Sequence, residues 1–124
     1  MKRLGPMLGL LVIGSLLALG ACAPSLQAQP VSVTVEHGAT FDTLVFRPSA
    51  AATLGLADRP VTVTGLNLQV NDPRCQSSAG QLLCRFGRVT PDHPYRLPFH
   101  GKVNIVTGWA ALDGDPSPQP FTWP

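Results

Sequence analysis

The sequence predicts a small all-β domain, an antiparallel sandwich of about six or seven short strands, and two observations support this fold class. Apolar and polar residues alternate in short runs that are rich in valine, threonine, leucine and phenylalanine, which is typical of half-buried strands. Glycine, proline, asparagine and aspartate separate these runs, and no stretch has the spacing of a convincing helix. Consecutive short strands with turns between them indicate two sheets packed around one core.

The first predicted strands lie directly after the N-terminal segment. Residues 31–36 alternate strictly and are rich in β-branched residues, so they form the clearest strand. A turn at residues 37–39 leads into a second strand over residues 40–46, which is expected to pack Phe41, Leu44 and Phe46 and to end at Arg47-Pro48.

The middle of the domain combines an ambiguous segment with a long alternating one. Residues 49–56 are predicted to be a loop, with one helical turn as the alternative, because Gly55 and Pro60 bound a short segment. Residues 61–64 and 66–70 form the longest alternating stretch, in which Gly65 marks a bulge or a bend.

The last part of the chain is expected to supply the remaining strands. They cover residues 81–86, 95–99 and 102–107, with 121–123 as a final short strand or a frayed end. Pro98 has no N–H to donate, so its strand is placed at a sheet edge, and His100-Gly101 is expected to break the chain before the next strand. Turns are predicted at residues 71–73, 90–94 and 113–118.

The chain begins with a segment typical of an export signal. Met1-Lys2-Arg3 precedes an uncharged run of apolar and small residues over 4–19, which is too short for a membrane-spanning helix. The run ends in Leu19-Gly20-Ala21-Cys22, an aliphatic residue and two small residues before a cysteine. This motif resembles the lipobox of bacterial lipoproteins, and an ordinary export signal with a coincidental cysteine is the alternative.

The lipoprotein resemblance implies that the chain is cleaved before Cys22 and that the Cys22 thiol carries a diacylglyceryl group. The chain would then comprise a signal peptide (1–21), a lipidated cysteine with an extended tether (22–30) and a β-sandwich domain (31–124). Such a protein is exported and anchored to a membrane through its lipid. Ala23 is not the aspartate that resembles an inner-membrane retention signal, so the outer membrane or cell surface is expected in a host with two membranes.

The charge of the domain argues against nucleic acid as a partner. The formal net charge is +2, but Lys2 and Arg3 fall in the predicted signal peptide, which leaves seven basic residues against seven acidic ones. Phosphate binding needs a concentrated basic face, which a neutral domain lacks. The arginines between residues 74 and 96 are interpreted as solvated residues at strand edges.

Two cysteines remain if Cys22 is lipidated, and they are predicted to form a disulfide. Export favours oxidation, and a Cys75–Cys84 bond would close a short loop. A metal site is the alternative, but the sequence has no CxxC motif and no further cysteine pair. No metal ion or cofactor is therefore predicted.

A second resemblance covers residues 61–106. It is carried by Val61-Thr-Val-Thr64, Cys75, Gly80, Leu83-Cys84, Gly87-Arg-Val89 and Thr90-Pro91. This pattern resembles the Ig-like conserved repeat of bacterial surface and adhesin-type proteins. The resemblance implies an Ig-like sandwich but no particular function, because sandwich folds serve many roles.

The sequence offers little evidence of catalysis. Asp92-His93 would be half of a hydrolase dyad with Ser77, Ser78 or Ser117, but none of these serines lies in a nucleophile-elbow pattern. Asp113-Gly-Asp115 lacks the third spaced acid and the closing glutamate of a calcium loop. Both segments are interpreted as turns, and we expect the protein not to be an enzyme.

Aromatic residues near the end of the chain suggest a binding surface. Tyr95, Trp109, Phe121 and Trp123 would either form a platform for a sugar or a peptide or complete the core. The sequence therefore predicts a lipid-anchored interaction or structural module of the cell envelope, whose partners are the membrane and an envelope protein or glycan. A glycan- or peptide-binding module that uses Trp109 and Trp123 is the alternative, and a small hydrolase is a further one.

Overall fold

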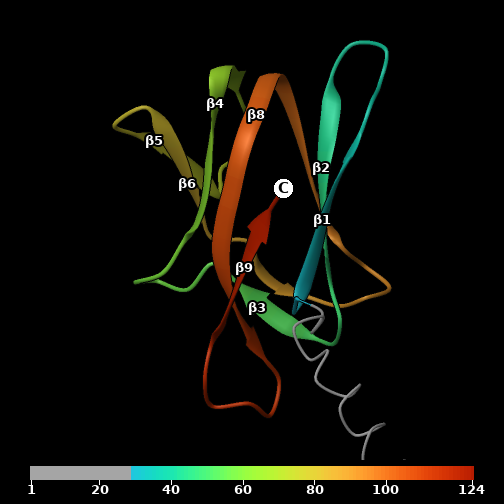
Figure 1. Cartoon of the computed structure of the whole chain (residues 1–124), viewed down its shortest axis with the longest axis vertical. Helices are drawn as coiled ribbons and strands as arrows, with labels where there is room; N and C mark the ends of the chain where they lie inside the picture. Colours follow the sequence, from blue (N-terminus) through green and yellow to red (C-terminus); the bar gives the residue numbers. More distant parts are fainter. Residues whose placement is uncertain (1–28) are drawn as a thin grey trace, which may run out of the picture.

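The computed structural model describes residues 29–124, and every regular element in this range is a β-strand (Figure 1). The predicted signal peptide, Cys22 and tether residues 23–28 lie outside the described residues. The strands are β1 (Val31–Glu36), β2 (Asp42–Pro48), β3 (Ala52–Leu54), β4 (Val61–Gln69), β5 (Cys75–Ser78), β6 (Gln81–Cys84), β7 (Gly87–Val89), β8 (Tyr95–Leu112) and β9 (Gln119–Trp123). Within residues 29–124, no helix could cross a membrane.

The all-β fold class is confirmed, with more strands than predicted. All strand pairs are antiparallel. The nine strands exceed the expected six or seven because β3, β5 and β7 are only three or four residues long. The segment 49–56, predicted as a loop, contains β3, which pairs with both β7 and β8. Runs this short are too brief for alternation to distinguish them from loops.

The strands form two layers that share β8. In the first layer β1 pairs with β2, and β2 pairs with residues 95–99 of β8. In the second layer the later part of β8 pairs with β4, β9 and β3, and β4 continues the sheet through β6 to β5. Figure 1 shows β8 as the long central ribbon, with β1 and β2 on one side and β4 to β6 on the other.

The predicted break at His100-Gly101 is wrong, because β8 runs through it. Pairing with β2 ends at Phe99, and pairing with β4 begins at His100. Gly101 has a φ of +99°, which lets the backbone bend here without leaving the sheet. Among residues 29–124, the part of β8 that contains Pro98 has β2 as its only strand partner, as expected for a residue without an N–H.

The predicted irregularity at Gly65 is confirmed. The register between β4 and β8 shifts between Thr64 and Gly65 and again between Leu66 and Gln69. A Cβ on Gly65 would lie on the carbonyl oxygen of Lys102, so only glycine permits this approach of the two backbones.

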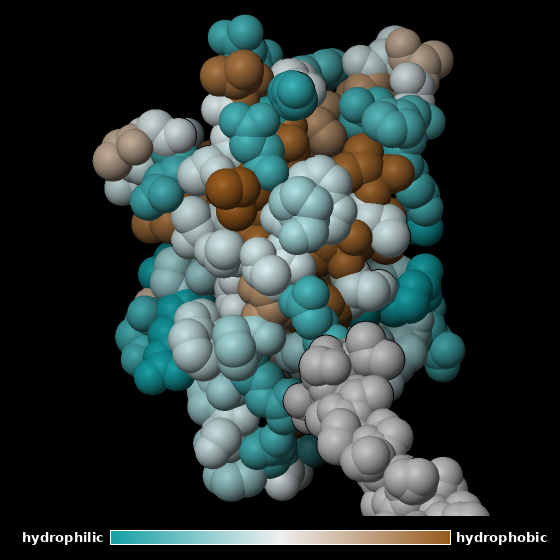
Figure 2. Space-filling model, viewed as in Figure 1, coloured by the Kyte–Doolittle hydropathy of each residue, from teal (hydrophilic) through white to brown (hydrophobic). Residues whose placement is uncertain are grey.

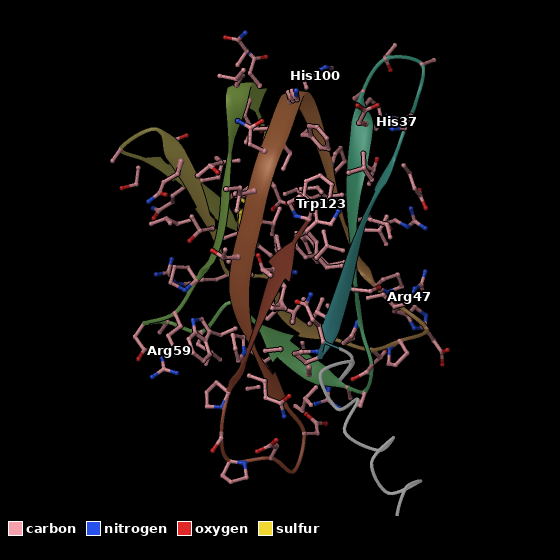
Figure 3. The ribbon with its side chains drawn as sticks, in the orientation of Figure 1. His37, Arg47, Arg59, His100 and Trp123 are labelled. Atoms are coloured by element: carbon pink, nitrogen blue, oxygen red, sulfur yellow. A yellow bond between two sulfur atoms is a disulfide. The ribbon has the colours of Figure 1, made fainter. Side chains whose placement is uncertain are left out.

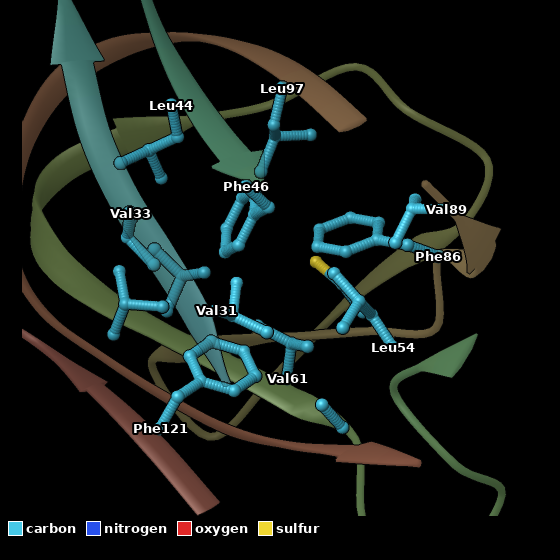
Figure 4. Packing of buried hydrophobic residues seen from close by; sticks show 14 of the residues in the cluster. Val31, Val33, Leu44, Phe46, Leu54, Val61, Phe86, Val89, Leu97 and Phe121 are labelled. Atoms are coloured by element: carbon cyan, nitrogen blue, oxygen red, sulfur yellow. The ribbon is translucent and has the colours of Figure 1, made fainter. Parts of the chain in front are cut away.

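The core lies between the layers and is filled by side chains from all of the longer strands (Figure 4). Phe46 is at its centre, with ring centroids 4.9 Å from Phe86 and 6.4 Å from Phe121. Phe41, which was expected to pack inside, is 45% exposed because it precedes β2 and lies in the β1–β2 loop. Its ring instead contacts His100 edge to face.

The predicted disulfide is confirmed. Cys75 and Cys84 are directly opposed in the β5–β6 hairpin, with a Cα–Cα distance of 4.0 Å. Ala79 and Gly80 form the two-residue turn, with φ values of +48° and +81° that match a type I′ hairpin. The bond therefore ties an edge strand to the sheet.

Candidate functional site

Of the four aromatic residues predicted as one platform, Phe121 is buried in the core, and the other three lie in three different environments. Tyr95 begins β8, Trp109 lies near the end of the same strand, and Trp123 ends β9. The pairing of β8 with β9 places the two tryptophan side chains on different faces of the sheet. Trp123 is opposite Val106, whose side chain is buried, whereas Trp109 is opposite Pro120 and three residues after Val106. Neighbouring positions alternate between the two faces of a sheet. Trp109 thus faces outward and Trp123 inward, and they do not form one platform.

Tyr95 is held in an internal network. Its hydroxyl donates a hydrogen bond to Asp72 Oδ2 at 2.5 Å, and its ring stacks on Phe86 with centroids 4.1 Å apart. The Arg74 guanidinium lies 5.7 Å from the ring centroid and donates to the Phe86 carbonyl oxygen. Burial, followed by the contact with Asp72, raises the pKa of Tyr95 to about 12. This arrangement joins the 70–75 segment to the core.

Trp109 lies in a shallow apolar groove on the outer face of β8 and β9. The groove has a volume of about 430 Å³ and is lined mainly by Trp109, Pro120, Thr107, Thr122 and Gln29. The Arg59 guanidinium lies over the Trp109 ring, 4.6 Å from its centroid, in cation–π contact. Arg59 was not singled out from the sequence, since it lies in the β3–β4 loop far from Trp109 in the chain.

Trp123 lies in a second hollow, which we call the Trp123 slot. Its apolar residues are Val35 of β1, Phe99 and Val103 of β8, and Trp123 of β9, and its volume is about 270 Å³. Its polar residues are His37, Asp42 and Lys102. Figure 3 shows Trp123 between β8 and β1, with His37 at the upper end of β1. The slot thus lies where β1, β8 and β9 meet.

The polar residues of the slot differ in how they are paired. His37 Nδ1 lies 3.4 Å from Asp42 Oδ1, and the same oxygen accepts a hydrogen bond from the Gly38 N–H at 3.2 Å. Within residues 29–124, no carboxylate forms an ion pair with Lys102. The slot therefore combines hydrocarbon and aromatic walls with one available cation, which suits an apolar group that carries a negative charge at one end.

The residues of the hydrolase alternative are scattered. His93 lies in a turn, where its N–H bonds to the Thr90 carbonyl and hydroxyl oxygens. Ser77 and Ser78 are on β5, and Ser117 is in the β8–β9 loop. In the described range, no hydrogen bond or ion pair joins His93 to any of these serines.

The acidic loop before β9 is arranged as a turn. Asp115 accepts hydrogen bonds from the Ser117 N–H and the Gln119 side chain, and these contacts lower the pKa of Asp115. Asp113 pairs with Arg88 at 2.7 Å. Among residues 29–124, no cluster of three or more histidine, cysteine or acidic side chains could hold a metal ion.

Comparison with protein-family models, with curated proteins and with solved structures finds no significant match for the chain.

Proposed function

We propose that the protein is a lipid-anchored, non-enzymatic binding module of the bacterial cell envelope, and that the Trp123 slot holds an apolar group of its ligand. The anchor is supported by the motif Leu19-Gly20-Ala21-Cys22 after an uncharged apolar run. Two or more acyl chains give stable membrane attachment, whereas a single chain gives only marginal binding. Residues 61–106 resemble an Ig-like repeat, and domains with this fold serve many binding functions.

The slot itself supports the binding role. Ligand sites are typically concave and largely apolar, with a few polar groups that orient the ligand. The slot has this composition, with Trp123 and Phe99 as aromatic walls and Lys102 as the free cation. We therefore infer an amphipathic ligand whose apolar part enters beside Trp123 and whose anionic group lies near Lys102.

Anilinonaphthalene sulfonate has this chemistry and can test the slot directly. In the Trp109→Phe variant, Trp123 is the sole tryptophan, since the chain has only two. Energy transfer from Trp123 to the bound probe is expected, and Lys102→Gln should weaken binding about two- to fivefold, as for an exposed charge pair. Arg96→Gln is the matched control, because Arg96 is paired with Glu36 and does not line the slot.

Val35→Phe provides the blocking variant, because Val35 lies at the slot and is only partly buried. Its larger ring should fill the slot and abolish energy transfer while the protein still unfolds cooperatively. Unchanged probe binding in folded Val35→Phe protein would refute the slot as the site.

The anchor is tested separately, by fatty-acid labelling of cells that express the wild type or Cys22→Ser. Label is expected in the wild type alone. Equal label in both proteins would show that Cys22 is not the attachment point.

A further inference from the structure

The two layers present outer faces of very different chemistry. The outer face of the first layer carries Arg47, Glu36 and Arg96, and the last two form an ion pair at 2.6 Å. The outer face of the second layer follows from register, because the buried Val61, Val63, Val106 and Phe121 point inward. Side chains that alternate with these along β4, β8 and β9 point outward. They form what we call the threonine face: Thr62, Thr64, Leu66, Ile105, Thr107, Trp109, Pro120 and Thr122.

The threonine face is uncharged and is continuous across three strands. Thr62 of β4 opposes Thr107 of β8, which opposes Thr122 of β9. Leu66 and Ile105 are 61% and 51% exposed on it, although they are large apolar side chains. Figure 2 shows weakly polar and apolar side chains over much of β8 and β9, with strongly hydrophilic ones among them and at the edges.

Cations flank this face at both ends. Arg59 lies over Trp109 at one end, and at the other end Lys102, which also lines the Trp123 slot, opposes Leu66. Asp58 precedes Arg59 in the same loop, but no ion pair joins the two. The face is therefore complementary to a surface that is negatively charged and partly apolar.

The chain enters the domain at this face. Gln29 lines the Trp109 groove, and its Oε1 accepts a hydrogen bond from the Thr122 N–H at 2.6 Å. Cys22 lies seven residues before Gln29, and seven extended residues span at most about 25 Å. A lipid on Cys22 would thus keep the threonine face close to the headgroups of its membrane.

We propose that the threonine face lies against the anionic phospholipid headgroups of the membrane that holds the Cys22 lipid. This inference rests on the proposed lipid attachment. Trp109 is suited to the interface because its ring is apolar and its indole N–H is polar. Arg59 and Lys102 pair with phosphate groups, and the threonine hydroxyls hydrogen-bond to the headgroups. A second copy of the chain is the other occupant that the experiment below distinguishes.

The two tryptophans allow a direct test in the lipidated, full-length protein. Vesicles of phosphatidylcholine and phosphatidylglycerol with brominated acyl chains quench only tryptophans near the bilayer. The Trp123→Phe variant reports on Trp109 alone, and Trp109→Phe reports on Trp123 alone. Strong quenching of Trp109 and much weaker quenching of Trp123 are expected.

Charge variants test how the face is held. Each cation near an anionic surface contributes about fivefold to binding, so Arg59→Gln with Lys102→Gln should lower the docked-to-undocked ratio about thirtyfold. Arg47→Gln with Arg96→Gln, on the opposite layer, is the matched control and should leave quenching unchanged. Raising the salt concentration should act like the first pair of substitutions.

The outcomes separate this inference from the proposed anchor. Mass spectrometry first establishes whether Cys22 carries lipid, and a lipid-free protein would overturn both proposals. A lipidated, vesicle-bound protein whose Trp109 is unquenched would overturn the docking alone. Self-association of the lipidated protein that Ile105→Asp abolishes, without quenching of Trp109, would instead assign the face to a second copy.

Discussion

Gly101→Ala should be among the most damaging small substitutions in the domain. Its φ of +99° costs an L-residue about 1–2 kcal/mol. The new Cβ would also clash with the carbonyl oxygens of Asn67 and Leu66. These are backbone atoms, so the two strands must separate, at a cost of about 1–3 kcal/mol. The free energy of unfolding should therefore fall by about 2–5 kcal/mol, as measured by urea denaturation with tryptophan fluorescence.

Gly80→Ala is the matched control, because Gly80 has a similar φ of +81° but a Cβ added to it would meet no atom within 4 Å. It should show only the backbone cost of about 1–2 kcal/mol. Equal losses in the two variants would refute the idea that close packing of β4 on β8 requires Gly101. Gly101 also lines the Trp123 slot, so a shift of the backbone at this position would change the shape of the proposed binding site.

Three further predictions concern the core and the disulfide. Tyr95 is the single tyrosine, so its absorbance titration should have a midpoint of about 12 instead of 10, and Asp72→Asn should lower it. Because the folded state favours the neutral hydroxyl, the associated stability is complete below pH 10 and is lost as pH rises toward 12; a midpoint at 10 would contradict this. Replacing Cys75 and Cys84 by alanine should lower the free energy of unfolding by about 3 kcal/mol, and an unchanged urea midpoint would argue against this. Phe121→Ala should cost about 3–5 kcal/mol, since Phe121 is buried, and a loss below about 1 kcal/mol would show that β9 is dispensable to the core.

Strand positions could be predicted best where a strand has one solvent-exposed face and one buried face. Residues 31–36 alternate strictly, and β1 occupies these positions in the structure. β3 and β7 could not be recognised in this way, because strands of three residues are defined by their partners and not by their own pattern. β8 was divided at His100-Gly101 because glycine usually ends a strand, whereas here it allows the strand to pass from one layer to the other.

The candidate site was less accessible to sequence reasoning than the disulfide. Cys75 and Cys84 are nine residues apart and form the even pair expected in an exported domain. The Trp123 slot instead combines residues of β1, β8 and β9, which only the register brings together. The same register places Trp109 and Trp123 on opposite faces, although both are late aromatic residues in the sequence.

The place where the chain enters the domain also determines how it would respond to mechanical force. A pull on the segment before Gln29 is transmitted past the Gln29 side-chain bond to Thr122 into β1, which is paired with β2 from Val31 to Glu36. Antiparallel hydrogen bonds run perpendicular to the strands, so a pull along β1 loads the whole ladder at once instead of opening it bond by bond. The Ser49 N–H bond to the Pro30 carbonyl oxygen extends the loaded ladder by one further bond. A domain tethered at this end would be attached through its shear-resistant strand.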